Sequence, residues 1–356
     1  MRRREFVVGA LSTGALVTTL PAASATPFAA DALSGAVPYG AAIRIDELAD
    51  ILYSEAVRTY CKVIVAEGAM KWSDLQAVRG SFTFEPTDTL LAFAQDNDIE
   101  LRGHTLAWYA ALPEWAERIS SAEEARTELV HHIDTVVGRY KGRIRSWDVV
   151  NEAIAEDPTP DAPYRDSVWL RHLGPDYIEL ALRTASEADS SAQLVLNDYE
   201  FEQPTDQARA KRKAFLDMVR GLKSRNVPLH AIGLQGHLRG ESAVDSPGIS
   251  SFVAELSALG LGILVTELDV IDDQLPGPIE ERDKLIAARA REFLSAIGSV
   301  VRPEIVVTWG VSDQHTWVPI WFSRQDGLPN RPLPLDENYQ PKELMRVIQD
   351  FTQSFA

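Results

Sequence analysis

The sequence predicts an α/β protein whose single domain is a (β/α)8 barrel, also called a TIM barrel. Short apolar runs rich in β-branched residues alternate with stretches of helical periodicity, as expected for parallel βα units. Eight such units within roughly 300 residues match the usual size of a barrel. Most of the apolar runs end in polar or aromatic side chains. In this fold the carboxyl ends of the strands meet at one face, so these side chains are expected to converge.

The eight predicted strands are continuous apolar runs, as expected for strands that are covered on both faces. They comprise residues 37–43, 61–67, a strand ending at 101–105, 144–150, 193–199, 231–237, 263–269 and 304–310. Helical periodicity predicts helices over residues 45–60, from 86 onward, and over 122–140, 175–188, 206–225, 249–259 and 278–297. Pro86 and Asp88 suit the first turn of the second helix. Residues 156–166, rich in proline and acid, are a predicted loop.

The N-terminus is predicted to be an export signal, residues 1–25, followed by a mobile leader, residues 26–36, and the barrel domain, residues 37–356. Arginines come first, an apolar stretch follows, and Ala23-Ser24-Ala25 is a small-residue cleavage site. The segment Arg3-Arg4-Glu5-Phe6 resembles the twin-arginine type of signal. We therefore expect an exported protein, periplasmic or extracellular. The single cysteine, Cys61, cannot form an internal disulfide.

The composition narrows the classes of partner. The chain has 356 residues, 45% hydrophobic, with a net charge of -17. Such an acidic protein repels nucleic acids and anionic membranes, so neither is an expected partner. No metal-ligand constellation, phosphate loop or nucleophile elbow is present in the sequence, which predicts no metal and no cofactor. We expect a monomer.

Two strand-end glutamates, Glu152 and Glu267, are the centre of the predicted site. Glycoside hydrolysis needs two carboxyl groups that face each other across a cleft. Alternatively, Asn151 and Glu152 could cap a helix, and both glutamates could form structural ion pairs. Flat aromatic rings that pack against sugars favour the first interpretation. Three tryptophans follow or end strands and are candidates for this role, namely Trp108, Trp309 and Trp317. Trp115 and Trp169 are candidates for the core.

An ordered set of motifs between about residues 38 and 345 resembles the family 10 glycoside hydrolases, which are mostly endo-β-1,4-xylanases. The motifs are Gly103-His104-Thr105-Leu106-Ala107-Trp108, residues 147–153, Asn197-Asp198-Tyr199, residues 233–237, residues 266–270 and Trp309-Gly310-Val311-Ser312-Asp313. The resemblance implies that Glu152 is the general acid/base and Glu267 the nucleophile of a retaining double displacement. Asn151 would bind the 2-hydroxyl of the sugar at the cleavage point.

The resemblance also implies how the other side chains act. His237, held by Asp269, would orient Glu267, with Gln235 beside it. The remaining substrate-binding positions are Glu67, Lys71, His104, Trp108, Tyr199, Trp309 as a floor and Trp317 as a lid. Taken alone, a histidine after a strand such as His237 is more often a structural residue, and Lys71 could be a surface cation.

Two segments depart from the family pattern. Gly68 and Ala69 stand where the family has Asn and Glu, and Tyr109, Ala110 and Ala111 stand where it commonly has His-Ser-Gln. Each lost hydrogen bond to a sugar hydroxyl costs about 0.5–1.5 kcal/mol in binding. We therefore expect the chemistry to be retained and the recognition of the glycone, the sugar side that supplies the anomeric carbon, to be altered.

The predicted function is that of an exported retaining endo-β-1,4-xylanase acting on xylan. One alternative is a related β-glycosidase that acts on another glycan or glycoconjugate, as the altered glycone segments suggest. The other is a glycan-binding relative that has lost catalysis, against which the presence of both glutamates with Asn151 and His237 argues.

Overall fold

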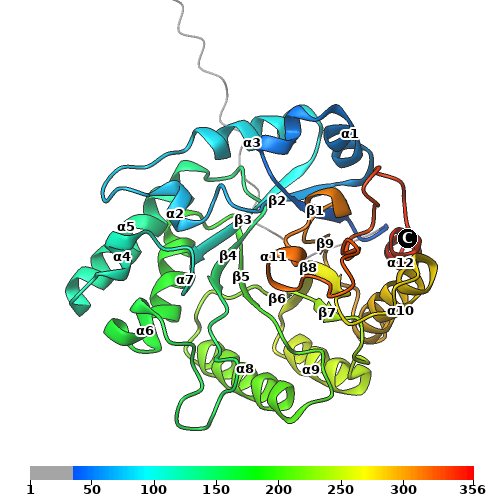
Figure 1. Ribbon diagram of the computed structural model, residues 1–356. Helices are drawn as coiled ribbons and strands as arrows, with labels where there is room; N and C mark the ends of the chain where they lie inside the picture. Colours follow the sequence, from blue (N-terminus) through cyan, green and yellow to red (C-terminus); the bar gives the residue numbers. More distant parts are fainter. Residues whose placement is uncertain (1–34) are drawn as a thin grey trace, which may run out of the picture.

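The computed structural model describes residues 35–356, which form a closed parallel barrel surrounded by helices (Figure 1). The barrel strands are β1 (Tyr39–Ile43), β2 (Val63–Ala66), β3 (Glu100–Ala107), β4 (Ser146–Asn151), β5 (Gln193–Asp198), β6 (Ala231–Leu234), β8 (Gly262–Ile271) and β9 (Val306–Thr308). Each strand pairs in parallel with the next, and β9 pairs with β1 to close the barrel. The predicted (β/α)8 fold is confirmed. The export signal and most of the leader lie outside the described residues.

The helices pack around the outside of this barrel (Figure 1). The longer ones are α1 (Ile51–Tyr60), α3 (Glu85–Asp96), α5 (Ala122–Arg139), α7 (Asp176–Ala188), α8 (Asp206–Ser224), α9 (Ser246–Ala258), α10 (Ile279–Gly298) and α12 (Glu343–Gln353). The shorter ones are η1 (Asp46–Ala49), α2 (Trp72–Leu75), α4 (Glu114–Glu117), α6 (Val168–Leu173), η2 (Asp313–His315) and α11 (Val318–Trp321). Within residues 35–356, no helix is both long and apolar enough to span a bilayer.

The short helices after η1 were not predicted, and two longer helical regions also differ from the prediction. The helix expected over residues 45–60 is divided, because Asp50 is extended and its carboxylate accepts the backbone N–H of Leu52 at 2.9 Å, which starts α1. The final helix, α12, is absent from the predicted elements, although Leu344, Val347 and Ile348 follow helical spacing and are buried. It lies beside α10 and completes the outer layer (Figure 1).

The sixth predicted strand, residues 231–237, is wrong in its second half. β6 ends at Leu234, and a short separate strand, β7 (His237–Arg239), pairs with β8. Between them Gly236 has a φ of +79°, a conformation that glycine adopts without the strain a side chain would add. The break lets Gln235 and His237 approach the centre of the barrel mouth from different directions.

The barrel interior is a packed core rather than a channel. Its apolar cluster contains Ala42, Val63, Val65, Val195, Ala231, Leu264, Ile305, Val307 and Trp309. Trp309 follows β9, so its ring belongs both to this cluster and to the carboxyl face where the strand-end polar residues gather. The floor of any site at that face is therefore rigid.

Candidate active site

Glu152 directly follows β4, and its backbone conformation fixes the direction of its side chain. Its φ is +55°, which is uncommon for a residue with a side chain and costs on the order of 1–3 kcal/mol. The N–H of Glu152 donates to the carbonyl of Asn197 on β5 at 2.8 Å. The chain therefore turns sharply after β4 and leaves the nearly buried carboxyl group over the barrel mouth.

The carboxyl group of Glu152 has neutral hydrogen-bond partners. Its Oε1 accepts from Gln235 Nε2 at 3.2 Å and from Asn151 Nδ2 at 3.1 Å. Burial raises the pKa of Glu152, and the negative charges of Asp198 and Glu267 raise it further. Gln235 was expected beside Glu267, but its side chain donates to Glu152 because the strand break at Gly236 turns it that way. Only the backbone carbonyl of Gln235 meets Glu267, accepting its N–H at 2.9 Å.

Glu267 lies within β8 and has strong donors around it. Its Oε1 accepts from Asn197 Nδ2 at 2.6 Å, and its Oε2 lies 3.3 Å from His237 Nε2. Burial by itself would raise the pKa of Glu267, but the hydrogen bond from His237 and the charges of His104 and His237 lower it overall. The second glutamate is thus kept as a carboxylate.

His237 is fixed between two carboxylates, as the sequence motif suggested. Its Nδ1 lies 2.9 Å from Asp269 Oδ1 on the neighbouring strand. Burial opposes a charged imidazole, yet the charge and hydrogen bond of Asp269, together with Glu267, raise the pKa of His237 well above its ordinary value. The other oxygen of Asp269 accepts the indole N–H of Trp317 at 2.7 Å, which ties Trp317 to the same network.

Asn197 connects the two glutamates, a role that the sequence did not reveal. In addition to Glu267, it donates to Asn151 Oδ1 at 2.9 Å, and its own Oδ1 accepts from Thr266 at 2.6 Å. A Cβ at Gly233 on β6 would lie 2.2 Å from that oxygen, so only glycine leaves room for this amide. The available signal was its place at the end of an apolar run, but an asparagine there has several ordinary uses.

A buried ion pair behind His104, formed by Arg102 and Asp148, was also missed. Asp148 on β4 binds Arg102 Nη2 at 2.6 Å and His104 Nδ1 at 3.0 Å, and His104 lies 4.0 Å from Glu267. Burial would raise the pKa of Asp148, but Arg102 and His104 lower it. Opposite charges within two apolar runs, Leu101-Arg102-Gly103 and Trp147-Asp148-Val149, were the signal for this pairing.

One wall of the site combines a cation with two indole rings. Lys71 Nζ lies 5.1 Å from the centroid of the Trp108 ring and 5.8 Å from that of Trp309. Lys71 and Glu67 also line a cavity of 460 Å³ between the ends of β1 and β2 and helix α3. The predicted residues Glu67, Lys71, Trp108 and Trp309 are therefore brought to one side of the mouth.

Tyr199, another predicted sugar contact, is engaged by protein groups. Its hydroxyl donates to Glu156 at 2.8 Å and accepts from Arg165 at 2.7 Å. The Arg165 guanidinium also lies 4.6 Å from the centroid of the Tyr109 ring. Arg165 and Glu156 belong to the predicted loop, which gave no sign of this function, so Tyr199 forms part of a polar cluster with them.

The two tryptophans assigned to the core support this mouth from below. Trp169 is fully buried, and its indole N–H donates to the carbonyl of Trp108 at 3.1 Å. Trp115 is partly buried and donates to the carbonyl of Gln76 at 2.9 Å. Trp72 stacks on Trp169 with 4.8 Å between the ring centroids, so an aromatic layer fixes the segment that carries Trp108.

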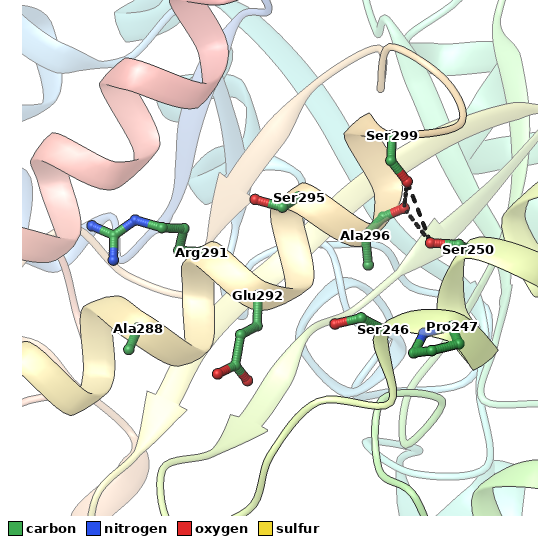
Figure 2. Close-up of a pocket in the computed structure, with 9 residues that line it drawn as sticks. All are labelled: Ser246, Pro247, Ser250, Ala288, Arg291, Glu292, Ser295, Ala296 and Ser299. Carbon is green, nitrogen blue, oxygen red and sulfur yellow. Dashed lines mark hydrogen bonds between the residues drawn. The ribbon is translucent and has the colours of Figure 1, made fainter.

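Another cavity, of 660 Å³, lies on the outside of the barrel between α9 and α10 (Figure 2). Ser246, Ser250, Arg291, Glu292 and Ser295 line it, and none of the strand-end residues reaches it. Among residues 35–356, no group of three or more His, Cys, Asp and Glu side chains could hold a metal ion.

Comparisons with known proteins identify relatives of this chain. The chain is 34% identical over 307 residues to endo-1,4-beta-xylanase B of Thermotoga neapolitana, which covers 85% of this chain and 83% of the relative. It is 37% identical over 310 residues to endo-1,4-beta-xylanase B of Paenibacillus barcinonensis, covering 81% and 88%. Some other relatives are longer, and the chain spans 27% to 44% of three of them.

The fold comparison points the same way. The crystal structure of xylanase 10B from Thermotoga petrophila RKU-1 in complex with xylobiose superimposes with a TM-score of 0.80 at 32% identity, covering 89% of this chain and 94% of that one. The sequence model of the family described as glycosyl hydrolase family 10 matches residues 29–351, nearly the whole length of the barrel. With its strand-end glutamates at the mouth of a (β/α)8 barrel, the chain belongs to glycosyl hydrolase family 10.

Proposed function

We propose that the chain is an endo-β-1,4-xylanase that cleaves xylan with retention of configuration. The observation that carries the proposal is the contrast between two glutamates at one barrel mouth. Burial and like charges raise the pKa of Glu152, whereas His237 and His104 lower that of Glu267. Two carboxyl groups with opposite proton affinities are what an acid and a nucleophile require.

In the first step, the Glu267 carboxylate attacks the anomeric carbon. A glycosyl–ester bond forms while the glycosidic C–O bond breaks, and Glu152 gives its proton to the leaving oxygen. In the second step, Glu152, now a carboxylate, takes a proton from water. The water oxygen attacks the anomeric carbon, the ester bond breaks, and Glu267 is released as a carboxylate.

The surrounding residues serve this reaction through binding. His237 and Asn197 stabilise the carboxylate of Glu267 before and after the ester exists. Lys71 and His104 would bind sugar hydroxyls, with Trp309 beneath the sugar and Trp317 above it. Relatives that share most of the barrel are named endo-1,4-beta-xylanases, and xylanase 10B of Thermotoga petrophila, which has the same fold, was solved with xylobiose. Both observations support xylan as the substrate.

The test is hydrolysis of xylan with NMR observation of the first product. We expect internal cleavage into xylo-oligosaccharides whose new reducing ends are initially β. Initial release of α product would show inversion and exclude the role of Glu267. Binding of xylo-oligosaccharides without turnover, even of an activated aryl xylobioside, would favour a glycan-binding relative instead.

A second candidate is hydrolysis of a different β-linked glycan or glycoconjugate. The cavity beside Glu67 and Lys71 also contains Gly68, and a Cβ added there would meet no atom within 4 Å. This open space could receive a glycone larger than xylose. Measuring kcat/KM on xylan and on glucan-, mannan- and exopolysaccharide-derived substrates separates the two candidates.

We also propose that the protein is exported, on the basis of the N-terminal sequence. When the whole chain is expressed with Arg3 and Arg4 intact, the protein should be recovered outside the cytoplasm. Its first residues should have been removed. Replacing both arginines with lysine should leave it inside the cell. Export that is unaffected by that change would exclude the twin-arginine type of signal.

A further inference from the structure

A buried ion pair lies directly beneath the segment that carries Glu152. Lys211, on α8, and Asp198, the last residue of β5, are both fully buried, and Lys211 Nζ lies 2.9 Å from Asp198 Oδ1. The ammonium group also lies 3.8 Å from the centroid of the Tyr199 ring. A buried charge pair is costly to desolvate and is weak support for stability alone, so its position needs a reason.

The contacts of Asp198 supply that reason. Its Oδ2 accepts the backbone N–H of Ile154, two residues after Glu152, at 3.1 Å. Its Oδ1 accepts the N–H of Tyr199 at 2.9 Å. One carboxylate thus joins the turn after β4 to the turn after β5, and together with the bond from the Glu152 N–H to the Asn197 carbonyl it fixes the left-handed backbone at Glu152.

We propose that Asp198 and Lys211 form a positioning pair for Glu152, which fixes the turn that bears the acid and places one negative charge beside its carboxyl group. The inference rests on the proposed role of Glu152 and concerns residues that have no assigned role in it. Lys211 supplies the counter-charge that lets a carboxylate occupy this buried position. Neither residue contacts the reacting atoms in this arrangement, so both act through Glu152.

The charges around Glu152 define the expected effect. Its carboxyl group faces Asp198 from β5, Glu267 from β8, and the phenols of Tyr109 and Tyr199 from the segments after β3 and β5. After burial, Asp198 is the strongest influence that raises the pKa of Glu152. Lys211 faces Asp198 and three acids of the surrounding loops, Glu156, Glu200 and Glu202.

The direction follows from the sign of that charge. The general acid must carry its proton, so activity is lost as pH rises through the pKa of Glu152. Asp198→Asn removes a negative charge and leaves Lys211 unpaired, and both changes lower that pKa. The alkaline limb of kcat/KM should therefore move to lower pH, by on the order of half a pH unit or more.

A second signature separates positioning from general damage. A misplaced acid slows cleavage of substrates with poor leaving groups, which need protonation, but not of those with good ones. Asp198→Asn should lose on the order of tenfold in kcat/KM, which reports glycosylation, on a phenyl xylobioside and less than about threefold on a dinitrophenyl xylobioside. Equal loss on both, with an unchanged alkaline limb, would show that the pair is only structural and would overturn the proposal.

A double variant of the ion pair separates loss of positioning from loss of stability. Removing one partner of a buried ion pair destabilises a protein, so Asp198→Asn combined with Lys211→Met is made as well, because it leaves no unpaired buried charge. The double variant also lacks the Asp198 charge and should show the same leaving-group dependence and the same direction of shift. Lys213→Met is the matched control, since Lys213 on the same helix pairs with Asp217 at the surface. Lys213→Met should change neither the leaving-group dependence nor the alkaline limb of kcat/KM.

Failure of this inference can be told apart from failure of the proposed function. Glu152→Ala is measured on the same two substrates. If it shows no leaving-group dependence, Glu152 is not the acid and the proposed function needs revision. If Glu152→Ala shows the dependence and the Asp198 variants do not, only the role of the ion pair is wrong.

Discussion

The two sides of the barrel mouth carry the same residue type in opposite chemical settings. Around Glu152, the hydrogen-bond partners are neutral amides, and the neighbouring charges are negative. Around Glu267, the partners are an amide and an imidazole held by Asp269. The pKa of the first rises and that of the second falls. Side-chain identity thus supplies a carboxyl group at the site, while the neighbouring groups decide its protonation and its role.

The largest expected effect comes from removing the nucleophile side. Glu267→Ala should reduce kcat/KM on the order of 10⁵-fold on every substrate, because no covalent intermediate can form whatever the leaving group. The measurement is kcat/KM on xylan and on a dinitrophenyl xylobioside, with circular dichroism to check folding. Appreciable turnover of the activated substrate alone would assign the nucleophile elsewhere.

Removing the acid side should have a smaller and selective effect. Glu152→Ala should lower kcat/KM on xylan by on the order of 10²- to 10⁴-fold, since the leaving oxygen is no longer protonated. Glycosylation by a dinitrophenyl xylobioside should be nearly unchanged, and azide should accelerate turnover by attacking the intermediate in place of water. If Glu267→Ala and Glu152→Ala each lower kcat/KM equally on xylan and on the dinitrophenyl xylobioside, the two glutamates do not differ in role as nucleophile and acid.

The difference between the pKa values of the two glutamates should become smaller when a neighbouring residue, His237, is replaced. Glu267 must be ionised to attack, and His237 helps to lower its pKa, so His237→Asn should raise that pKa. The acidic limb of kcat/KM should then move to higher pH, by on the order of one unit. The alkaline limb, which reports Glu152, should stay in place. His131→Asn, an exposed histidine on α5, is the control, and an acidic limb that does not move would contradict the network.

The smallest effect concerns the wall beside Lys71. Gly68→Asn adds a side chain where a Cβ meets open space, and it restores an amide that could bind a glycone hydroxyl. We expect kcat/KM on aryl xylobioside to rise about threefold to tenfold relative to aryl xyloside, the equivalent of about 0.5–1.5 kcal/mol. Gly138→Asn on the outer helix α5 is the control. A strong native preference for the xylobioside that Gly68→Asn leaves unchanged would show that other residues already bind that sugar.

Local sequence patterns were sufficient to predict the positions of most strands and helices. Apolar runs and helical periodicity located the eight barrel strands and seven of the outer helices, because each strand is buried on both faces and each helix on one. The strand break after Leu234 was not foreseen. It depends on Gly236 and on the contact of Gln235 with Asp198, whose partners are distant in sequence.

The sequence alone predicted the fold class, the family resemblance and the gathering of Glu152, His237 and Glu267 at the carboxyl face, although Glu267 lies within β8 and His237 begins β7. It could do so because barrel topology sends every strand end to one face. The donor and the charges that surround each carboxyl group are visible only in the folded protein, since Asn197, His104 and the buried pair Asp198–Lys211 come from different strands and helices. Proton affinity depends on burial and on charges a few ångströms away, and those distances exist only once the barrel has closed.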